Sequence, residues 1–417
     1  MKTHYKVIVV GGGTGGLMLT TQLISKGVAT DIAVIEPSDK HYYQPAWTLV
    51  GAGTYDFKKT MKPMKSVMPK NVDWFKHRVE LLVPDNKEVK LSDGSVLTYD
   101  FLVLSPGLEH DYTLVPGLQE AINDPSSNVA SIYSDPERVW DNIKNFKGGT
   151  ALFTQPTTPI KCGGAPQKIM YLAAAAFKKA GIKDKTKVVF ATAGGVIFGV
   201  KVIKETLMKV VDRKGINLKF GHQLESIDYK NKIAWYKLGN NVGYHNEQGV
   251  EIIEEEGRVG IKYDFLHTAP PSVAPKFIVS SGLANAGGWL DVDQYTLQHK
   301  KYPTIFGIGD VAALPTAKTA AAIRKQVPVI IDHIKKMKVG ITELEQKYNG
   351  YSSCPLVTDY GKMVLAEFDY DNNFTPDPKL KWMFVFDSSK ESWLLWLLKK
   401  FGLPFLYWKK MLKGKDV

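Results

Sequence analysis

The stretch "HYKVIVVGGGTGGLMLTTQLISKG" (4–27) decides the fold of the first part of the chain. It has the pattern of an apolar strand, a glycine-rich turn and a helix that ends at Gly27. Gly11, Gly13 and Gly16 fit the spacing G-x-G-x-x-G. Glycine permits a tight turn and a close approach of the backbone to a pyrophosphate, and the amino end of the helix stabilises that anion. The stretch therefore predicts a dinucleotide-binding turn.

A second apolar segment supports this interpretation. "DIAVIEP" (31–37) is typical of a buried strand and contains Glu36, 20 residues after Gly16. A carboxylate at this place accepts hydrogen bonds from a ribose. The glycine spacing alone is weak, but strand, turn, helix, strand and acid in this order strongly indicate a dinucleotide site.

The chain returns to this domain near residue 302. "YPTIFGIGDVAALPTAKTAAAIRKQ" (302–326) predicts a short strand that ends at Gly309 and Asp310, followed by an alanine-rich helix. Asp310 suits a ribityl hydroxyl, and a helix N-terminus suits the electron-rich end of a reduced flavin. An ordinary strand-to-helix turn is the alternative, but the first motif favours FAD.

Two internal similarities predict a second copy of the same plan. "LSDGSVLTYDFLVLSPG" (91–107) is similar to "EEEGRVGIKYDFLHTAPP" (254–271), with Tyr-Asp-Phe-Leu in both. In addition, "KVIVVGGGTGG" (6–16) aligns with "KVVFATAGGVI" (187–197). We therefore expect two dinucleotide folds in tandem.

In this alignment the second copy has lost its fingerprint. Thr192 stands in place of the first glycine and Ile197 in place of the third. A β-branched residue there obstructs close helix–strand packing and phosphate approach. We expect the second domain to keep the fold without a nucleotide.

The predicted fold class is therefore α/β, with two Rossmann-like domains, the second degenerate, and a C-terminal region that associates with a membrane. The predicted first part of the FAD domain is 1–112, and the second domain, with Cys162, is 113–285. The chain returns to the FAD domain over 286–340, and the C-terminal region, with Cys354, is 341–417.

Composition narrows the classes of partner. The chain has 417 residues, 44% of them hydrophobic, and a net charge of +12. This excess favours anionic partners such as membrane surfaces, nucleotides or small anions, although it can also be incidental. No basic block with interleaved aromatics indicates nucleic acid, and no metal site is predicted. The first strand begins almost at Met1, so we expect no targeting segment.

The two cysteines stand in turn-rich segments. Cys162 lies in "TPIKCGGAPQK" (158–168) and Cys354 in "GYSSCPLVT" (350–358). A single isolated cysteine is more often an inert buried thiol. Two of them in broken segments of a flavin-fold chain instead favour a redox pair.

Cys162 has the surroundings of a reactive thiol. It precedes Pro166, which we expect at the first position of a helix. The helix N-terminus and the neighbouring Lys161 and Lys168 should lower the pKa of this thiol. Cys162 is therefore the candidate thiolate facing the flavin.

The C-terminal end is rich in aromatics and lysines. "ESWLLWLLKKFGLPFLYWKKMLKGKDV" (391–417) has apolar runs far shorter than the roughly 20 residues that span a bilayer. The pattern suits helices that lie in the headgroup layer, with packing on the protein core as the alternative. The preceding "MVLAEFDY" (363–370) and "KWMFVFD" (381–387) are predicted strands.

Taken together, these motifs resemble a known family. "VVGGGTGGL", "HYYQPAWTLVGAG", "TPIKCGGAPQKIMYL", "YPTIFGIGD", "TAKTAAA" and "GYSSCPLVTDYGKMVLAEFDY" are similar to sulfide:quinone oxidoreductase, in the two-cysteine form of mitochondria and some bacteria. The resemblance runs nearly end to end. It implies FAD, hydrogen sulfide as electron donor, and ubiquinone or menaquinone as acceptor. It also implies peripheral attachment to a bacterial cytoplasmic or mitochondrial inner membrane.

The resemblance also assigns residues. It implies Cys162 and Cys354 as the redox pair, with the persulfide on Cys354. Many bacterial relatives carry a third essential cysteine, which this chain lacks, so the resemblance does not imply growth of long polysulfides on three cysteines. The implied acceptor of the sulfane sulfur is sulfite, glutathione, coenzyme A or sulfide. The resemblance does not fix the oligomeric state, and a homo-oligomer is one alternative. The implied FAD contacts are Gly11, Gly13, Thr14, Gly15, Gly16, Glu36, Gln44, Val79, Gly107, Asp310 and Lys318.

Three other classes compete with this interpretation. A type II NADH:quinone oxidoreductase needs an intact second nucleotide fingerprint and no cysteine pair. A pyridine-nucleotide disulfide reductase places two close cysteines soon after its opening unit, where this chain has "HYYQPAWTLVG" (41–51). A non-enzymatic flavin sensor explains neither the cysteines nor the tail.

Overall fold

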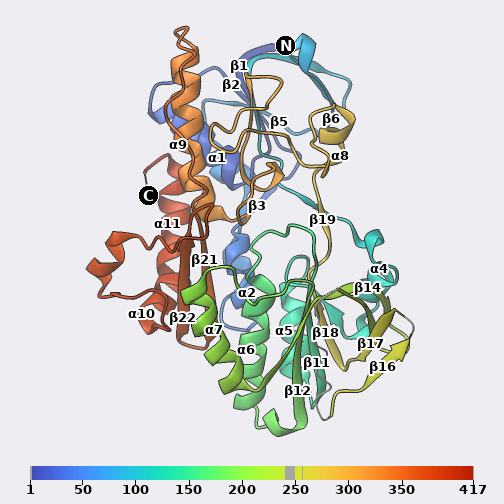
Figure 1. Cartoon of the computed structure of the whole chain (residues 1–417). Coiled ribbons are helices and arrows are strands. Elements are labelled where there is room, and N and C mark those ends of the chain that lie inside the picture. The colour runs from blue at the N-terminus through green and yellow to red at the C-terminus, as the bar shows by residue number, and fades with distance from the viewer. Residues whose placement is uncertain (1, 240–248, 256, 417) are drawn as a thin grey trace.

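The computed structural model describes residues 2–239, 249–255 and 257–416. Two α/β units lie one above the other in Figure 1, with the C-terminal region along one side of both. The first unit contains a seven-stranded sheet of order β5-β2-β1-β8-β7-β6, with β20 paired to β8. Its strands are β1 (His4–Val10), β2 (Ile32–Ile35), β5 (Asp73–Phe75), β6 (Val79–Val83), β7 (Glu88–Leu91), β8 (Val96–Leu104) and β20 (Ile305–Gly307).

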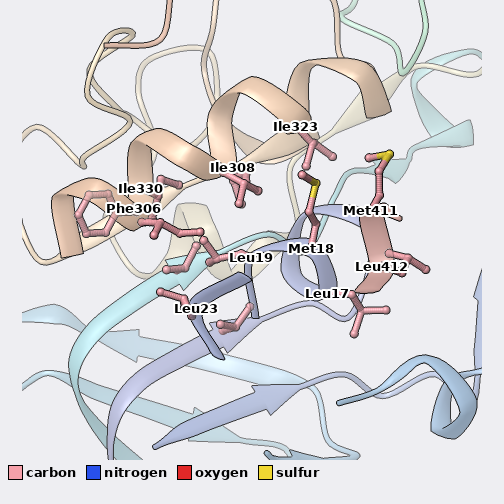
Figure 2. Close-up of a cluster of buried hydrophobic side chains, with 14 of the residues drawn as sticks. Leu17, Met18, Leu19, Leu23, Phe306, Ile308, Ile323, Ile330, Met411 and Leu412 are labelled. Atoms are coloured by element: carbon pink, nitrogen blue, oxygen red, sulfur yellow. The ribbon is translucent and has the colours of Figure 1, made fainter. Parts of the chain in front are cut away.

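Two helices cover this sheet beside the glycine-rich turn. They are α1 (Thr14–Ser25), which follows β1 directly, and α9 (Ala320–Met337), which follows β20. Their apolar side chains share one core cluster with the end of the chain. Figure 2 shows this packing, with α1 between α9 and the turn that carries Met411 and Leu412. The paired strand, turn and helix expected from residues 4–27 are confirmed.

The second unit is a five-stranded sheet in which every pair is parallel. Its order is β10-β18-β11-β12-β13. The strands are β10 (Val129–Ala130), β11 (Gly149–Gln155), β12 (Thr186–Thr192), β13 (Ile216–Phe220) and β18 (Phe265–Thr268). The helices on it are α5 (Pro136–Asn145), α6 (Ala165–Lys179) and α7 (Lys201–Lys214).

The sheet orders correct the alignment of the two copies. The first sheet contains the run β20-β8-β1-β2-β5, and the second runs β10-β18-β11-β12-β13. The strand and helix equivalent to β1 and α1 are therefore β11 and α6, not β12 and α7. The pairing of 6–16 with 187–197 is wrong, whereas the Tyr-Asp-Phe-Leu similarity falls on β8 and β18 at matching places.

The second copy is degenerate for a reason that the sequence alignment missed. In the first unit only residues 11–13 separate β1 from α1, whereas residues 156–164 separate β11 from α6. This longer loop contains Cys162. The cysteine thus occupies the place that the phosphate-binding turn holds in the first unit.

Smaller elements join the two units. Two crossing segments pair as β9 (Glu109–His110) and β19 (Ser272–Val273). An antiparallel sheet packs on the second unit through β14 (His222–Asp228), β15 (Ile233–Leu238), β16 (Ile252–Glu255) and β17 (Arg258–Lys262). Other short elements are β3 (Lys40–Tyr42), α2 (Trp47–Val50), β4 (Met61–Pro63), α3 (Met64–Val67), α4 (Leu118–Asn123) and α8 (Lys276–Ser280). The domain boundaries given above stay a prediction.

The C-terminal region is a hairpin followed by helices. Figure 1 shows α10 and α11 in red beside the hairpin β21–β22, with the preceding loop projecting outward. Within the described residues, no helix combines the length and apolar character that crossing a bilayer requires. The elements are β21 (Ser352–Asp359), β22 (Lys362–Phe368), α10 (Trp393–Leu397), a π-helical turn (Leu398–Gly402) and α11 (Leu403–Lys409).

One of the two strands predicted before the C-terminal helices does not form. "MVLAEFDY" contributes to β22, as predicted, but "KWMFVFD" does not form a strand. A 3₁₀ helix (Pro378–Met383) ends there, and Phe384 has a left-handed φ of 58°. Trp382, Phe384 and Phe386 are each more than three-quarters exposed. The alternating apolar side chains therefore face solvent from a turn instead of packing on a sheet.

Candidate active site

The glycine-rich turn forms a cradle that larger residues would fill. A Cβ on Gly11 would overlap the carbonyl of Ser105, and one on Gly16 would overlap the carbonyl of Gly11. A Cβ on Gly13 would meet nothing within 4 Å. Gly11 and Gly16 are therefore required for the close approach of strand and helix, while the space over Gly13 stays open. The turn fits a diphosphate at the N-terminus of α1.

A cavity of about 740 Å³ extends from this turn to the C-terminal helices. Its volume is in the range of cofactor and ligand sites. The cavity brings together most of the residues assigned from the sequence: Gly11, Gly13, Thr14, Gly15, Glu36, Gln44, Gly107, Cys162, Asp310 and Lys318.

Three assigned residues do not line it. Gly16 lies behind the turn, in α1. Val79 begins β6 and packs against a core cluster of the first sheet that contains residues of β1, β2, β7 and β8. Cys354 is 2% exposed and packs in the core of the second unit. A contact of Val79 with the cofactor therefore stays a prediction without support from this cavity.

Glu36 fastens the end of β2 to the turn. One carboxylate oxygen accepts the backbone N–H of Gly12 at 2.7 Å, and the other accepts that of Ser38 at 2.7 Å. The carboxylate thus lies at the mouth of the diphosphate cradle, where a ribose acceptor is expected.

Asp310 and Lys318 form the opposite wall. Lys318 Nζ donates to the carbonyl oxygens of Asp310 at 2.6 Å and Ala312 at 3.0 Å. Burial lowers the pKa of Lys318 to about 8, and the Asp310 charge opposes that shift. Burial raises the pKa of Asp310, against the nearby lysines. The backbone N–H of Cys162 donates to the carbonyl of Lys318 at 2.7 Å, so the cysteine loop is tied to this wall.

The two cysteines are neighbours although 192 residues separate them. Their sulfur atoms lie 3.9 Å apart. Cys162 has a φ of +53°, which turns the loop sharply before α6. A Cβ on Gly164 would lie 2.6 Å from the Cys354 sulfur. A glycine at 164 is therefore what lets the second cysteine reach the first.

The hairpin presents its two faces to different environments. Cys354 pairs with Ala366 across the strands, and Ser353 pairs with Glu367. Because side chains alternate along a strand, neighbouring positions point to opposite faces. One face packs in the core with Cys354, and the other lines the cavity through Ser353, Pro355, Leu365 and Glu367. Of the pair, Cys162 thus faces the cavity and Cys354 lies behind it.

Lys168 stabilises negative charge on Cys162. Its ammonium donates to the Cys162 sulfur at 2.9 Å, and the side chain is 2% exposed. The hydrogen bond from Cys354 and the charge of Lys168 hold the pKa of Cys162 well below its usual value despite burial. The same hydrogen bond and burial raise the pKa of Cys354. Cys162 is the thiolate of the pair and Cys354 the thiol.

Comparisons with known proteins agree with this geometry. Residues 5–141 match the family model described as pyridine nucleotide-disulphide oxidoreductase. The mitochondrial sulfide:quinone oxidoreductase of Mus musculus is 40% identical over 416 residues, which cover 99% of this chain and 87% of the mouse protein. The chain belongs to the sulfide:quinone oxidoreductase family. This family is FAD-dependent, and FAD is the cofactor of this flavoprotein oxidoreductase.

The fold of the family is also known from a solved structure. The sulfide:quinone oxidoreductase of Aquifex aeolicus superposes with a TM-score of 0.73 at 19% identity, covering 99% of this chain and 92% of that one. The competing class is distant: a type II NADH:quinone oxidoreductase of Staphylococcus aureus matches at 29% identity over 28% of this chain and 29% of its own length.

Of the two lysines predicted beside the Cys162 thiol, one lies elsewhere. Lys161 was expected beside the thiol, but its ammonium donates to Gln44 at 2.8 Å. Only Lys168 of the two contacts the sulfur. Pro166 lies within the first turn of α6, one residue after its first residue, Ala165.

A further buried lysine escaped the sequence analysis. Lys399 is 2% exposed, lines the cavity and donates to the carbonyl of Pro45 at 2.8 Å. Burial and the nearby Lys168 lower its pKa to about 7. Helical spacing from the buried Leu395 and Trp396 was the available signal, because residues three and four apart share a helix face.

Proposed function

We propose that this chain oxidises hydrogen sulfide with Cys162 and Cys354 and passes two electrons through FAD to a membrane quinone. The observation that carries the proposal is the 3.9 Å cysteine pair with a buried ammonium 2.9 Å from Cys162. An inert thiol needs no such cation, whereas a thiolate leaving group does. Cys162 also lines the same cavity as the glycine-rich turn.

In the first step, hydrosulfide attacks Cys354 in the oxidised pair. A sulfur–sulfur bond forms between hydrosulfide and Cys354, and the bond between Cys354 and Cys162 breaks. The electron pair stays on Cys162, next to Lys168. A thiol with a lowered pKa leaves faster, so the asymmetry of the two pKa values favours attack at Cys354.

In the second step, a nucleophile takes the outer sulfur from Cys354. Sulfite, glutathione, coenzyme A or a second sulfide can serve. Cys354 then rejoins Cys162 with loss of two electrons. Overall, the sulfur atom of one hydrosulfide becomes bonded to one nucleophile, and one proton and two electrons are released. FAD, when bound, supplies the two-electron acceptor for the thiolate and the donor for the quinone.

The distance between the two cysteine sulfur atoms determines how much movement is needed to form the oxidised pair. A disulfide bond is about 2.0 Å long, whereas the thiols lie 3.9 Å apart. Direct closure requires the Cys162 loop to move, and a bridging sulfur atom between the two would require less movement. In the directly bonded form hydrosulfide reacts as described. In the bridged form it would break the bond between Cys354 and the bridging sulfur, so Cys162 would leave as a persulfide anion instead of a thiolate.

A second hollow, of about 430 Å³, lies beside the cysteine loop and would offer the sulfur compounds a separate route. It is lined by the loop after β11, including Gly163 beside Cys162, and by Ala317 and Lys318. We assign the entry of hydrosulfide and the sulfur acceptor to this side. The quinone then approaches from the other.

The quinone side faces the membrane in this proposal. Large exposed apolar side chains gather in the C-terminal loop and helices: Trp382, Met383, Phe384, Phe386, Trp393, Phe401 and Phe405. Lysines intersperse them, as in interfacial segments. Leu380, Met383, Leu398, Leu403 and Leu406 line the nearby end of the large cavity. This apolar mouth, opening to a bacterial cytoplasmic or mitochondrial inner membrane, would admit the isoprenoid tail.

Anaerobic rapid mixing tests the proposed function. Sulfide should bleach the flavin absorbance of the purified enzyme, and a soluble quinone analogue should restore it. NADH at micromolar concentration should leave it unchanged. Rapid bleaching by NADH together with no response to sulfide would overturn the proposal.

A further inference from the structure

The C-terminal helix α11 is bonded to the glycine-rich turn. The Tyr407 hydroxyl lies 2.9 Å from the Thr14 hydroxyl and 2.5 Å from Nε2 of His41. The other ring nitrogen of His41, Nδ1, lies 3.0 Å from the carbonyl oxygen of Gly12. His41 and Tyr407 are both buried. A chain of three hydrogen bonds therefore runs from the turn, through His41 and Tyr407, back to the turn.

Hydrogen-bond chemistry fixes the direction of this chain. Burial lowers the pKa of His41 to about 4, so the ring is neutral at physiological pH and carries one N–H. A carbonyl oxygen can only accept, so Nδ1 donates to Gly12 and Nε2 accepts from Tyr407. The Tyr407 proton is then used, and Thr14 must donate its own proton to Tyr407. Gly12 and Thr14, the two residues that flank Gly13, are thus both hydrogen-bonded, Gly12 to His41 and Thr14 to Tyr407.

The end of the chain, residues 407–416, also packs beside helix α1, and we call this segment the clasp. Tyr407 and Trp408 pack on Tyr43 and His41. The carbonyl of Gly414 accepts from Ser25 at 3.4 Å, at the end of α1. Figure 2 shows the next turn beside α1, with Met411 and Leu412 near Leu17 and Met18. The clasp therefore runs from the start of α1 to its last residue.

The same helix, α11, also bears an exposed aromatic side chain, that of Phe405. Phe405 is 57% exposed, whereas Tyr407 is 1% exposed. Residues two apart lie on opposite sides of an α-helix. One rigid element thus has one side toward the cofactor turn and the other toward the proposed membrane face.

We propose that Tyr407 is a positioning residue of the FAD site, which shapes the turn at 12–14 through His41 and Thr14 and so links FAD occupancy to docking of α11. The inference rests on the proposed function only in taking this turn as the diphosphate site. Linkage is reciprocal, so FAD should hold α11 in place as strongly as α11 improves FAD binding. Removal of residues 391–417 should therefore weaken FAD binding as well as membrane contact.

Titration of FAD into the full-length protein, stripped of cofactor, tests this proposal. Tyr407→Phe should raise the FAD dissociation constant, measured by flavin fluorescence, about tenfold, as expected for the loss of one or two buried hydrogen bonds. Tyr360→Phe is the matched control, because its hydroxyl also donates to a backbone carbonyl, of Ala52 at 3.1 Å, away from the turn. It should stay within about twofold of the wild type, since that bond does not touch the FAD site.

A second measurement reports docking of α11 directly. Lys409, Lys413 and Lys415 are exposed trypsin sites in the clasp. FAD should slow cleavage there in the wild type, and this protection should disappear in Tyr407→Phe. Thr14→Val removes the same bond from the other side, so the double variant should bind FAD no more weakly than the weaker single variant.

Equal FAD affinity of Tyr407→Phe and Tyr360→Phe, or cleavage at the clasp that ignores FAD, would overturn the inference. If Tyr407→Phe does not fold, the protease readout of Thr14→Val decides, because Thr14 itself lines the FAD cavity and its FAD affinity alone does not report on Tyr407. A protein that shows both effects but is not reduced by sulfide keeps this inference and loses the proposed function.

Discussion

Lys168 donates a hydrogen bond to the sulfur of Cys162 across 2.9 Å, and its side chain is 2% exposed. Burial opposes the charge of this lysine, but its interactions with the cysteine pair, chiefly with Cys162, outweigh that effect and raise its pKa. The pair therefore consists of an ammonium and a thiolate, each stabilising the charge of the other in a water-poor site.

Lys168→Met should make flavin reduction by sulfide slower. Loss of a charged hydrogen bond costs about 1.5–3 kcal/mol, which corresponds to roughly ten- to a hundredfold in rate. The pKa of Cys162 should rise, so the low-pH limb of the rate should move to higher pH. Lys178→Met, an exposed change on the same helix, is the control. Identical pH profiles for both variants would contradict the thiolate assignment.

Gly164→Ala should separate the two sulfurs. The added Cβ would lie 2.6 Å from the Cys354 sulfur and 2.7 Å from a methyl of Leu356, so the hairpin must shift. We expect sulfide-dependent turnover to fall at least tenfold, since misplacing reacting atoms by about 1 Å can cost a hundredfold. Gly195→Ala adds a Cβ to open space and should turn over normally. A fully active Gly164→Ala enzyme would show that the close pair is not needed.

Trp382→Ser combined with Phe384→Ser should weaken flotation with liposomes. Each ring is more than three-quarters exposed, and burying one such ring in lipid contributes about 1.5–3 kcal/mol, so membrane affinity should fall at least tenfold. Flavin reduction by sulfide should be unchanged, because neither ring lines the cavity among the described residues. Val339→Ser, at another exposed apolar position, is the control. Normal flotation of the double variant would place the membrane contact elsewhere.

The part of the fold that depends on local chemistry was predictable. The β1–α1 turn follows from glycines that admit no other side chain at Gly11 and Gly16. The reactive surroundings of Cys162 followed in part from a helix start and a nearby Lys168. Both features lie within a few residues of the motif that indicates them.

The parts that depend on sheet order and distant contacts were not predictable. Residues 187–197 resemble 6–16 because a buried parallel strand has the same apolar composition in either place, and only the sheet order reveals that β11 is the true equivalent of β1. Lys399 and Tyr407 reach the site from the end of the chain. Alternating apolar residues at 381–387 indicated a strand because the sequence does not say whether a partner strand exists.

The central claim is that sulfide reacts at the pair with Cys354 as the sulfur carrier and Cys162 as the flavin-facing thiolate. Anaerobic mixing of sulfide with the wild type, Cys162→Ser and Cys354→Ser, followed by mass spectrometry, tests it most directly. Both variants should lose most turnover, because serine cannot form the disulfide. In the wild type the added sulfur should be on the Cys354 peptide or bridge the pair, and the long-wavelength absorbance of a thiolate beside the flavin should vanish only in Cys162→Ser. Absorbance that survives in Cys162→Ser and vanishes in Cys354→Ser would exchange the roles, and normal turnover of both variants would contradict the claim.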